Sequence, residues 1–155
     1  MRARASRWIA LGFGSGLSPW APGTVGTLWA WAVWHLLGSV FALELAPVTM
    51  FALLAAAFAF GVVACERTGR DLGAADHGAI VWDEALAFWV VLALVPAGAV
   101  NEIAAFALFR FFDIVKPPPI RQADATLGGG FGVMFDDLLA AAYTLLPFAL
   151  WSAWR

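Results

Sequence analysis

The ionisable residues of this chain are confined to short polar stretches between long uncharged runs. Two of these runs, residues 25–43 and 45–65, contain 19 and 21 residues with no formal charge at neutral pH, and the first includes one histidine, His35. A helix of about 20 apolar residues can cross a hydrocarbon core of about 30 Å. Shorter uncharged runs follow at residues 85–100, 103–109 and 138–154. The pattern therefore predicts an all-α protein with helices embedded in a membrane.

The composition explains why a bilayer is expected. Apolar residues make up 63% of the chain and charged residues only 13%, about half of the charged share in soluble domains. A chain of 155 residues has the size of one domain and too little volume to bury so much apolar surface. The net charge of −2 offers no basic surface to nucleic acid. We expect residues 1–155 to form one domain, an integral membrane helical bundle of four or five helices.

The basic residues predict the orientation of this bundle. Cytoplasmic segments carry an excess of Lys and Arg, and three arginines within the first seven residues place the N-terminus in the cytoplasm. If residues 103–114 return the chain as a short helix, eight of the nine basic residues lie on this side. The same path brings the three polar stretches there: residues 12–27, 66–84 and 110–137. We therefore expect a cytoplasmic-side active site, although without that helix the stretches would be divided between the two faces.

Two acidic pairs stand out, because Asp83 with Glu84 and Asp136 with Asp137 each come just before an apolar run. We expect both pairs at the starts of helices and at equivalent depths. One interpretation is that they only complement the helix dipoles. The other is that they converge, in which case four carboxylates would repel one another without a cation. Hard oxygen ligands favour Mg²⁺, so the sequence predicts a magnesium site made by some of these residues.

Arg110, Asp113 and Lys116 are spaced three residues apart and would share one face of a helix. They form either a salt-bridged helix end or a phosphate clamp. In a clamp, Arg binds phosphate oxygens bidentately and Lys adds a point charge. The prolines at positions 117–119 are expected to end the helix.

Residues 12–27 read GFGSGLSPWAPGTVGT, with five glycines and several hydroxyls, including those of Thr24 and Thr27. Such a stretch can bring backbone N–H groups close to a phosphate at the start of the next helix. It lacks the Gly-Lys-Ser/Thr of a P-loop, so a flexible lead-in to the helix is the alternative. His77, beside Asp76, is either a solvated loop residue or a secondary candidate for catalysis, and His35 is expected to be a hydrogen-bonded packing residue within a helix.

The absence of some motifs narrows the chemistry. The chain has no Cys-x5-Arg and no Asp-x-Asp, which argues against cysteine phosphatases and against the aspartyl-phosphate phosphatases that use that acidic pair. The lone Cys65 lies in an apolar run and is expected to pack. A metal-activated water or a carboxylate nucleophile remains.

Four motifs occur in the order SPWAPGTVGTLWA, DHGAIVWDE, FRFFDIVKPPPI and GGGFGVMFDD. In order and spacing they resemble the phosphatidylglycerophosphatase A family, over nearly the whole chain. The resemblance implies removal of the terminal phosphate from phosphatidylglycerophosphate, Mg²⁺ dependence and a bacterial inner-membrane location. It carries the family's motif residues onto this chain as follows: Asp83, Glu84, Asp136 and Asp137; Arg110, Asp113, Lys116 and Pro117; and Pro22, Gly23 and Thr24. The sequence departs from the family pattern at residues 85–87, where similar sequences have a larger aliphatic residue and a glycine.

We therefore expect a lipid phosphatase in phospholipid biosynthesis, in which the acids hold Mg²⁺ and a metal-bound water attacks phosphorus. Arg110 and Lys116 would hold phosphate oxygens, while Asp113 orients Arg110 or joins the metal ligands. The stretch with Thr27 would pack against the phospholipid headgroup. The alternative from another class is a cation channel or transporter with the acidic pairs as ion sites. A head-group phosphotransferase would need a nucleotide motif, which the sequence lacks.

Overall fold

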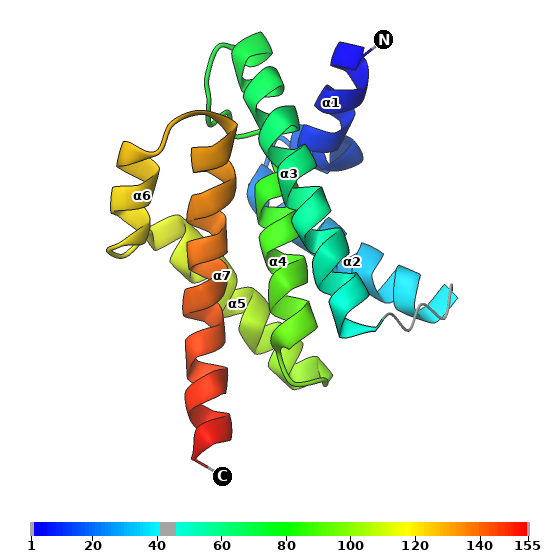
Figure 1. Ribbon diagram of the computed structural model, residues 1–155, viewed down its shortest axis with the longest axis vertical. Helices are drawn as coiled ribbons and strands as arrows, with labels where there is room; N and C mark the ends of the chain where they lie inside the picture. Colours follow the sequence, from blue (N-terminus) through cyan, green and yellow to red (C-terminus); the bar gives the residue numbers. More distant parts are fainter. Residues whose placement is uncertain (1, 41–45, 155) are drawn as a thin grey trace.

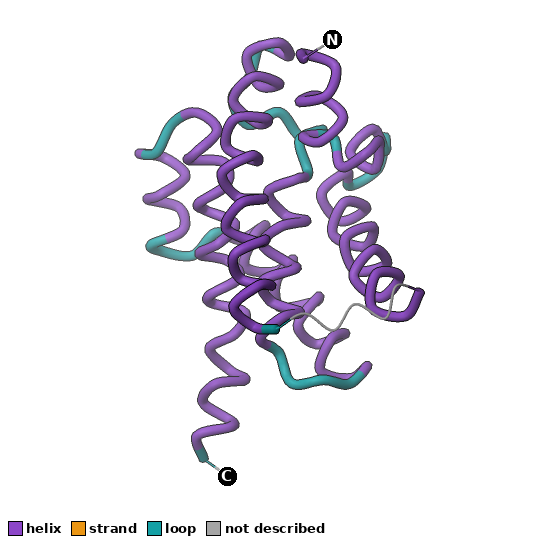
Figure 2. Tube along the Cα trace, turned by 45° about the vertical axis from the view of Figure 1, so that its right-hand side comes forward, coloured by secondary structure: helices purple, strands orange, loops and turns teal. Residues whose placement is uncertain are grey.

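The computed structural model describes residues 2–40 and 46–154, and none of these residues forms a strand, which confirms the all-α prediction (Figure 1, Figure 2). The elements in chain order are α1 (Arg2–Ala10), the 3-10 helix η1 (Gly12–Leu17), α2 (Pro22–Val40), α3 (Pro47–Leu72), α4 (Trp82–Leu94), α5 (Ala99–Val115), α6 (Ile120–Thr126) and α7 (Gly129–Ala153). These described helices outnumber the four or five expected, because α1, η1 and α6 are short helices formed by stretches rich in polar residues and glycine.

Among the described helices, two are long and apolar enough to cross a membrane, namely α3 with 26 residues and α7 with 25. They lie side by side, and the C-terminal part of α7 extends beyond the other helices (Figure 1). Their outer faces expose large apolar side chains, among them Phe60 of α3 and Leu150 and Trp151 of α7. The first predicted run, residues 25–43, lies mostly in α2, and its last three residues fall outside the described part of the chain.

The predicted run at residues 85–100 is not one helix, because the chain turns within it, at residues 95–98. Helix α4 ends at Leu94 and α5 begins at Ala99. Pro96 has no N–H to continue a helix, and Gly98 has a φ of 133°, which favours glycine. As a result α5 has 17 residues and starts earlier than the helix expected at residues 103–114.

Helix α4 lies at the centre, packed against α2, α3, α5 and α7. Its Phe88 and Val91 are fully buried and share a cluster with Phe109 of α5. Two tryptophan N–H groups fix its neighbours, since Trp89 Nε1 donates to Ala30 O of α2 at 2.8 Å and Trp82 Nε1 donates to Ala57 O of α3 at 3.3 Å. The first turn of α4, which carries Asp83 and Glu84, is therefore held rigidly inside the bundle.

Candidate active site

A cavity of about 410 Å³ opens where the first turns of α2 and α4, the end of α5 and the N-terminal third of α7 meet. Its wall contains the residues predicted to act in chemistry, apart from Thr27 and the secondary candidate His77. These residues are Pro22, Gly23, Thr24, Asp83, Glu84, Arg110, Asp113, Lys116, Asp136 and Asp137. Segments far apart in the sequence thus converge on one site.

Three carboxylates in this wall lie close enough together that they could share a metal ion. Oxygens of Asp83, Glu84 and Asp137 all lie within 4.8 Å of one another. Asp83 and Asp137 are buried, with 5% and 4% of their surface exposed. Among the described residues, nothing donates a hydrogen bond to Glu84 Oε2 or Asp137 Oδ2, although both atoms are buried. Unsatisfied buried carboxylate oxygens are costly, and Mg²⁺ takes such ligands, so these residues fit a divalent cation.

The electrostatics of the first turn of α4 agree with this arrangement. Burial, followed by repulsion from Glu84 and Asp137, raises the pKa of Asp83 well above its usual value. Burial, with repulsion from Asp113, also raises the pKa of Glu84 to about 7, although its hydrogen bond with Asp83 and the charge of Arg110 act in the opposite direction. A bound cation would favour the ionised forms of both groups.

The sequence predicted that Asp136 and Asp137 begin a helix. This was wrong, because both residues lie about two turns inside α7. These two carboxylates are therefore too far from the N-terminus of α7 to complement its helix dipole. Successive residues of a helix point in different directions, and these two have different neighbours. Asp137 belongs to the carboxylate triad, whereas Asp136 Oδ2 accepts a hydrogen bond from Lys116 Nζ at 2.5 Å.

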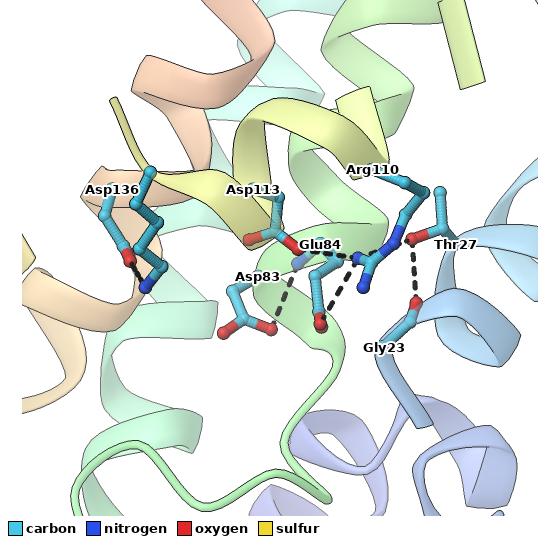
Figure 3. A network of polar contacts seen from close by, with 8 residues as sticks. Gly23, Thr27, Asp83, Glu84, Arg110, Asp113 and Asp136 are labelled. Atoms are coloured by element: carbon cyan, nitrogen blue, oxygen red, sulfur yellow. Dashed lines mark hydrogen bonds and ion pairs between the residues drawn. The ribbon is translucent and has the colours of Figure 1, made fainter. Parts of the chain in front are cut away.

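Arg110 is held against the triad by three partners (Figure 3). Its Nη1 lies 2.8 Å from Asp113 Oδ2 and 3.6 Å from Glu84 Oε1. The same nitrogen donates to Thr27 Oγ1 at 3.4 Å, and the Thr27 hydroxyl in turn donates to Gly23 O at 2.8 Å. Thr27 is fully buried, so it lies behind the guanidinium and fixes it.

Lys116 does not share a helix face with Arg110, contrary to the prediction from spacing. Helix α5 ends at Val115, and Lys116 adopts a left-handed conformation with a φ of 46°. Its Nζ lies between Asp136 and Asp124, 2.9 Å from Asp124 Oδ1. Burial alone would lower the pKa of Lys116, but the hydrogen bonds to these two carboxylates raise it. The site therefore contains a second fixed cation, paired with Asp136, which lies at the other end of the polar network from Arg110 (Figure 3).

The sequence analysis did not select Asp76 or Asp124 for the site. Asp76 lines the cavity from the loop before α4, and Asp124 of α6 binds Lys116. Both are exposed acids in polar stretches, and no motif distinguishes them from solvated charges. His77 does not line the cavity, and its Nδ1 accepts a hydrogen bond from Ala79 N at 3.2 Å.

The model of the family described as Phosphatidylglycerophosphatase A matches residues 8–151. The chain belongs to this family. It is 49% identical to Phosphatidylglycerophosphatase A of Haemophilus influenzae over 140 residues, 89% of this chain and 83% of that protein. Identity to the protein of the same name in Escherichia coli is 41% over 134 residues, 85% of this chain and 74% of the relative.

A third relative, from Bacteroides thetaiotaomicron, has the provisional name phosphatidylinositol-3-phosphatase. It is 39% identical over 148 residues, 92% of this chain and 90% of its own length. No solved structure gives a significant match. Family membership makes this chain an enzyme of the phosphatase class.

Gly23 of this phosphatidylglycerophosphatase A-family chain lies where no side chain fits. A Cβ at this position would collide with Glu84 Oε1 and lie 2.9 Å from Arg110 Nη2. We expect Gly23→Ala to displace both groups and to lower kcat/KM about tenfold, since small misplacements of site residues are costly. Gly38→Ala is the matched control in the same helix, because a Cβ there meets no atom within 4 Å. Equal activity of the two variants would show that the Glu84 and Arg110 positions do not matter.

Two polar pairs away from the cavity are ordered by the fold. Glu66 and Arg70, four residues apart on α3, form an ion pair. Glu66 Oε2 also accepts a hydrogen bond from Gly130 N at 2.5 Å, which anchors the start of α7 to α3. His35 is hydrogen-bonded, as expected, and its Nε2 lies 2.7 Å from Glu102 Oε2 of α5.

Proposed function

We propose that this protein is a Mg²⁺-dependent lipid phosphatase that hydrolyses phosphatidylglycerophosphate to phosphatidylglycerol and phosphate, in phospholipid biosynthesis. The names of the Haemophilus and Escherichia relatives support the substrate. The observation that carries the proposal is one cavity containing a carboxylate triad with unsatisfied buried oxygens, flanked by Arg110 and Lys116. A phosphate ester that binds together with a metal ion requires carboxylates to hold the metal and positively charged side chains to hold the phosphate.

Asp83, Glu84 and Asp137 would hold the metal. When bound, Mg²⁺ supplies charge neutralisation at the phosphate and lowers the pKa of a bound water. Asp136 was included among the expected metal ligands, but its ion pair with Lys116 supports a different role. We assign it the task of orienting the Lys116 ammonium.

Arg110 and Lys116 would bind the phosphate from two sides. Asp113 and Thr27 hold the guanidinium in a fixed orientation, so less freedom is lost when it grips two oxygens. Asp136 and Asp124 fix the Lys116 ammonium in the same way. The first turn of α2, with Pro22, Gly23 and Thr24, lines the cavity, and the backbone N–H groups of Gly23 and Thr24 would donate to the headgroup.

We further propose a multi-pass protein of the bacterial inner membrane, with four or five helices in the bilayer and the active site facing the cytoplasm. The two long apolar helices, the bacterial relatives and the clustering of basic residues support this topology. Single cysteines at positions 75 and 125 should then react with a membrane-impermeant thiol reagent from the cytoplasmic side, and one at position 46 only from the other. Labelling of 75 and 125 from opposite sides contradicts the topology.

The proposed function is tested by release of free phosphate from purified protein and phosphatidylglycerophosphate, without any nucleotide. Phosphatidylinositol-3-phosphate is the comparison substrate, because a relative bears the name of that activity. We expect release from phosphatidylglycerophosphate at a much higher kcat/KM. Preference for the inositol lipid would reassign the substrate, and no release from either lipid contradicts the phosphatase proposal.

A further inference from the structure

Helices α2 and α5 run antiparallel along one side of the bundle and are joined by three pairs of side chains. The pairs recur at intervals of four residues on each helix, so they lie along one face of each. They are Thr27 with Arg110 at 3.4 Å, Trp31 with Phe106 as stacked rings with centroids 5.7 Å apart, and His35 with Glu102 at 2.7 Å. The first pair belongs to the active site, and the last lies about 12 Å along the helix from it.

A second cavity of about 410 Å³ lies between the same two helices. Leu28 and Ala32 of α2 and Ala99 and Ile103 of α5 supply its apolar wall. On α2 these residues continue the face of Thr24, which lines the active-site cavity. On α5 they continue the face of Arg110 in the same way. We call this cavity the α2–α5 groove.

The polar atoms at the far end of the α2–α5 groove bind one another. Glu102 Oε2 accepts a hydrogen bond from Trp31 Nε1 at 2.7 Å and lies 2.7 Å from His35 Nε2. These groups are therefore satisfied without a ligand, as buried or membrane-facing polar groups need to be. What the groove offers to a ligand is apolar surface, so its occupant is expected to be a hydrocarbon chain.

We propose that the α2–α5 groove binds an acyl chain of the phospholipid whose phosphate is held in the active-site cavity. This inference rests on the proposed function. The groove starts beside the first turn of α2 and leads away from the polar end of the bundle, the direction that an acyl chain takes from a headgroup at the interface. Apolar burial there adds binding energy far from the reacting phosphate, which is expressed mainly in KM.

Filling the groove tests this assignment. Ala32→Trp places an indole in it, whereas Ala56→Trp makes the same change on an exposed position of α3 that lines neither cavity. The substrates are phosphatidylglycerophosphate with long palmitoyl chains and the same lipid with short hexanoyl chains. We expect Ala32→Trp to lower the ratio of kcat/KM for the palmitoyl substrate to kcat/KM for the hexanoyl substrate by about tenfold, the size of effect that a changed apolar pocket produces. Ala56→Trp should leave the ratio as in the wild type. Equal ratios in all three proteins contradict the groove assignment.

A crosslinking measurement on the unmodified chain covers the case in which Ala32→Trp does not fold. Phosphatidylglycerophosphate with a diazirine in its acyl chain is irradiated with wild-type protein in excess chelator, and the labelled peptides are mapped. We expect labels within residues 28–35 and 99–103, removed by unlabelled phosphatidylglycerophosphate but not by phosphatidylcholine. Labels that phosphatidylcholine removes equally show bulk lipid only and overturn the inference. Phosphate release by the wild type is measured separately, so a failure of the groove is distinguished from a failure of the phosphatase proposal.

Discussion

Asp137→Asn should lower the rate of phosphate release on the order of 100-fold or more, since even the outer partners of metal ligands cost about 10- to 100-fold when they are lost. The substitution keeps the shape of the side chain but removes one charge from the triad that Asp137 forms with Asp83 and Glu84. Raised Mg²⁺ should restore part of the rate, because weakened binding responds to mass action. The measurement is a Mg²⁺ titration of phosphate release.

Asp71→Asn, an exposed acid of α3, is the control for the change of charge. The Asp137→Asn protein should fold, because one of three mutually repelling carboxylates is neutralised. Its melting temperature should rise less with Mg²⁺ than that of the wild type, since a ligand stabilises the folded state in proportion to its binding. A near-normal rate with an unchanged Mg²⁺ requirement would remove Asp137 from the metal site.

Arg110→Lys keeps the charge but loses the planar guanidinium and should still cost on the order of 2–4 kcal/mol of transition-state stabilisation, by analogy with losing one preorganised donor. That corresponds to about 30- to 1,000-fold in kcat/KM. Lysine cannot contact Asp113 and Thr27 and also bind two phosphate oxygens with a fixed fork. The measurement is kcat/KM for the lipid phosphate over a range of Mg²⁺.

Extra Mg²⁺ should not rescue Arg110→Lys, in contrast to Asp137→Asn, because the defect lies in phosphate binding. Arg121→Lys, at an exposed position of α6, is the matched control. Helical content measured by circular dichroism checks that the variant is folded. A folded Arg110→Lys protein with normal kcat/KM would reduce Arg110 to an ion-pair partner of Asp113 and exclude the clamp.

The helices were predictable from the sequence because uncharged runs report helix positions directly, whereas their ends were less so. The run at residues 85–100 is continuous in hydropathy, but Pro96 and Gly98 divide it. The search for uncharged runs does not detect this break between α4 and α5, because neither Pro96 nor Gly98 is charged. Asp136 and Asp137 were placed at a helix start for a related reason, since the glycines that precede them in α7 are usually found in loops.

Most residues of the candidate site were predictable from the sequence, Asp76 and Asp124 excepted, but their pairing was not. Asp113 was expected beside Arg110 from their i, i+3 spacing, and the structure has that ion pair. Lys116 was expected on the same face. It follows the last turn of α5 and is itself in a left-handed conformation, and its side chain pairs with Asp136 instead. Local spacing holds only while the helix continues, and the partners of Lys116 come from α6 and α7. The contacts that form the α2–α5 groove likewise depend on tertiary packing.

The most direct test of the account is phosphate release from phosphatidylglycerophosphate by the wild-type protein in excess chelator, followed by stepwise addition of Mg²⁺. Three carboxylates in contact range, two of them with buried oxygens that no described residue satisfies, are arranged for a cation. The account predicts that activity disappears with the chelator and returns with Mg²⁺. Full activity in excess chelator would contradict it.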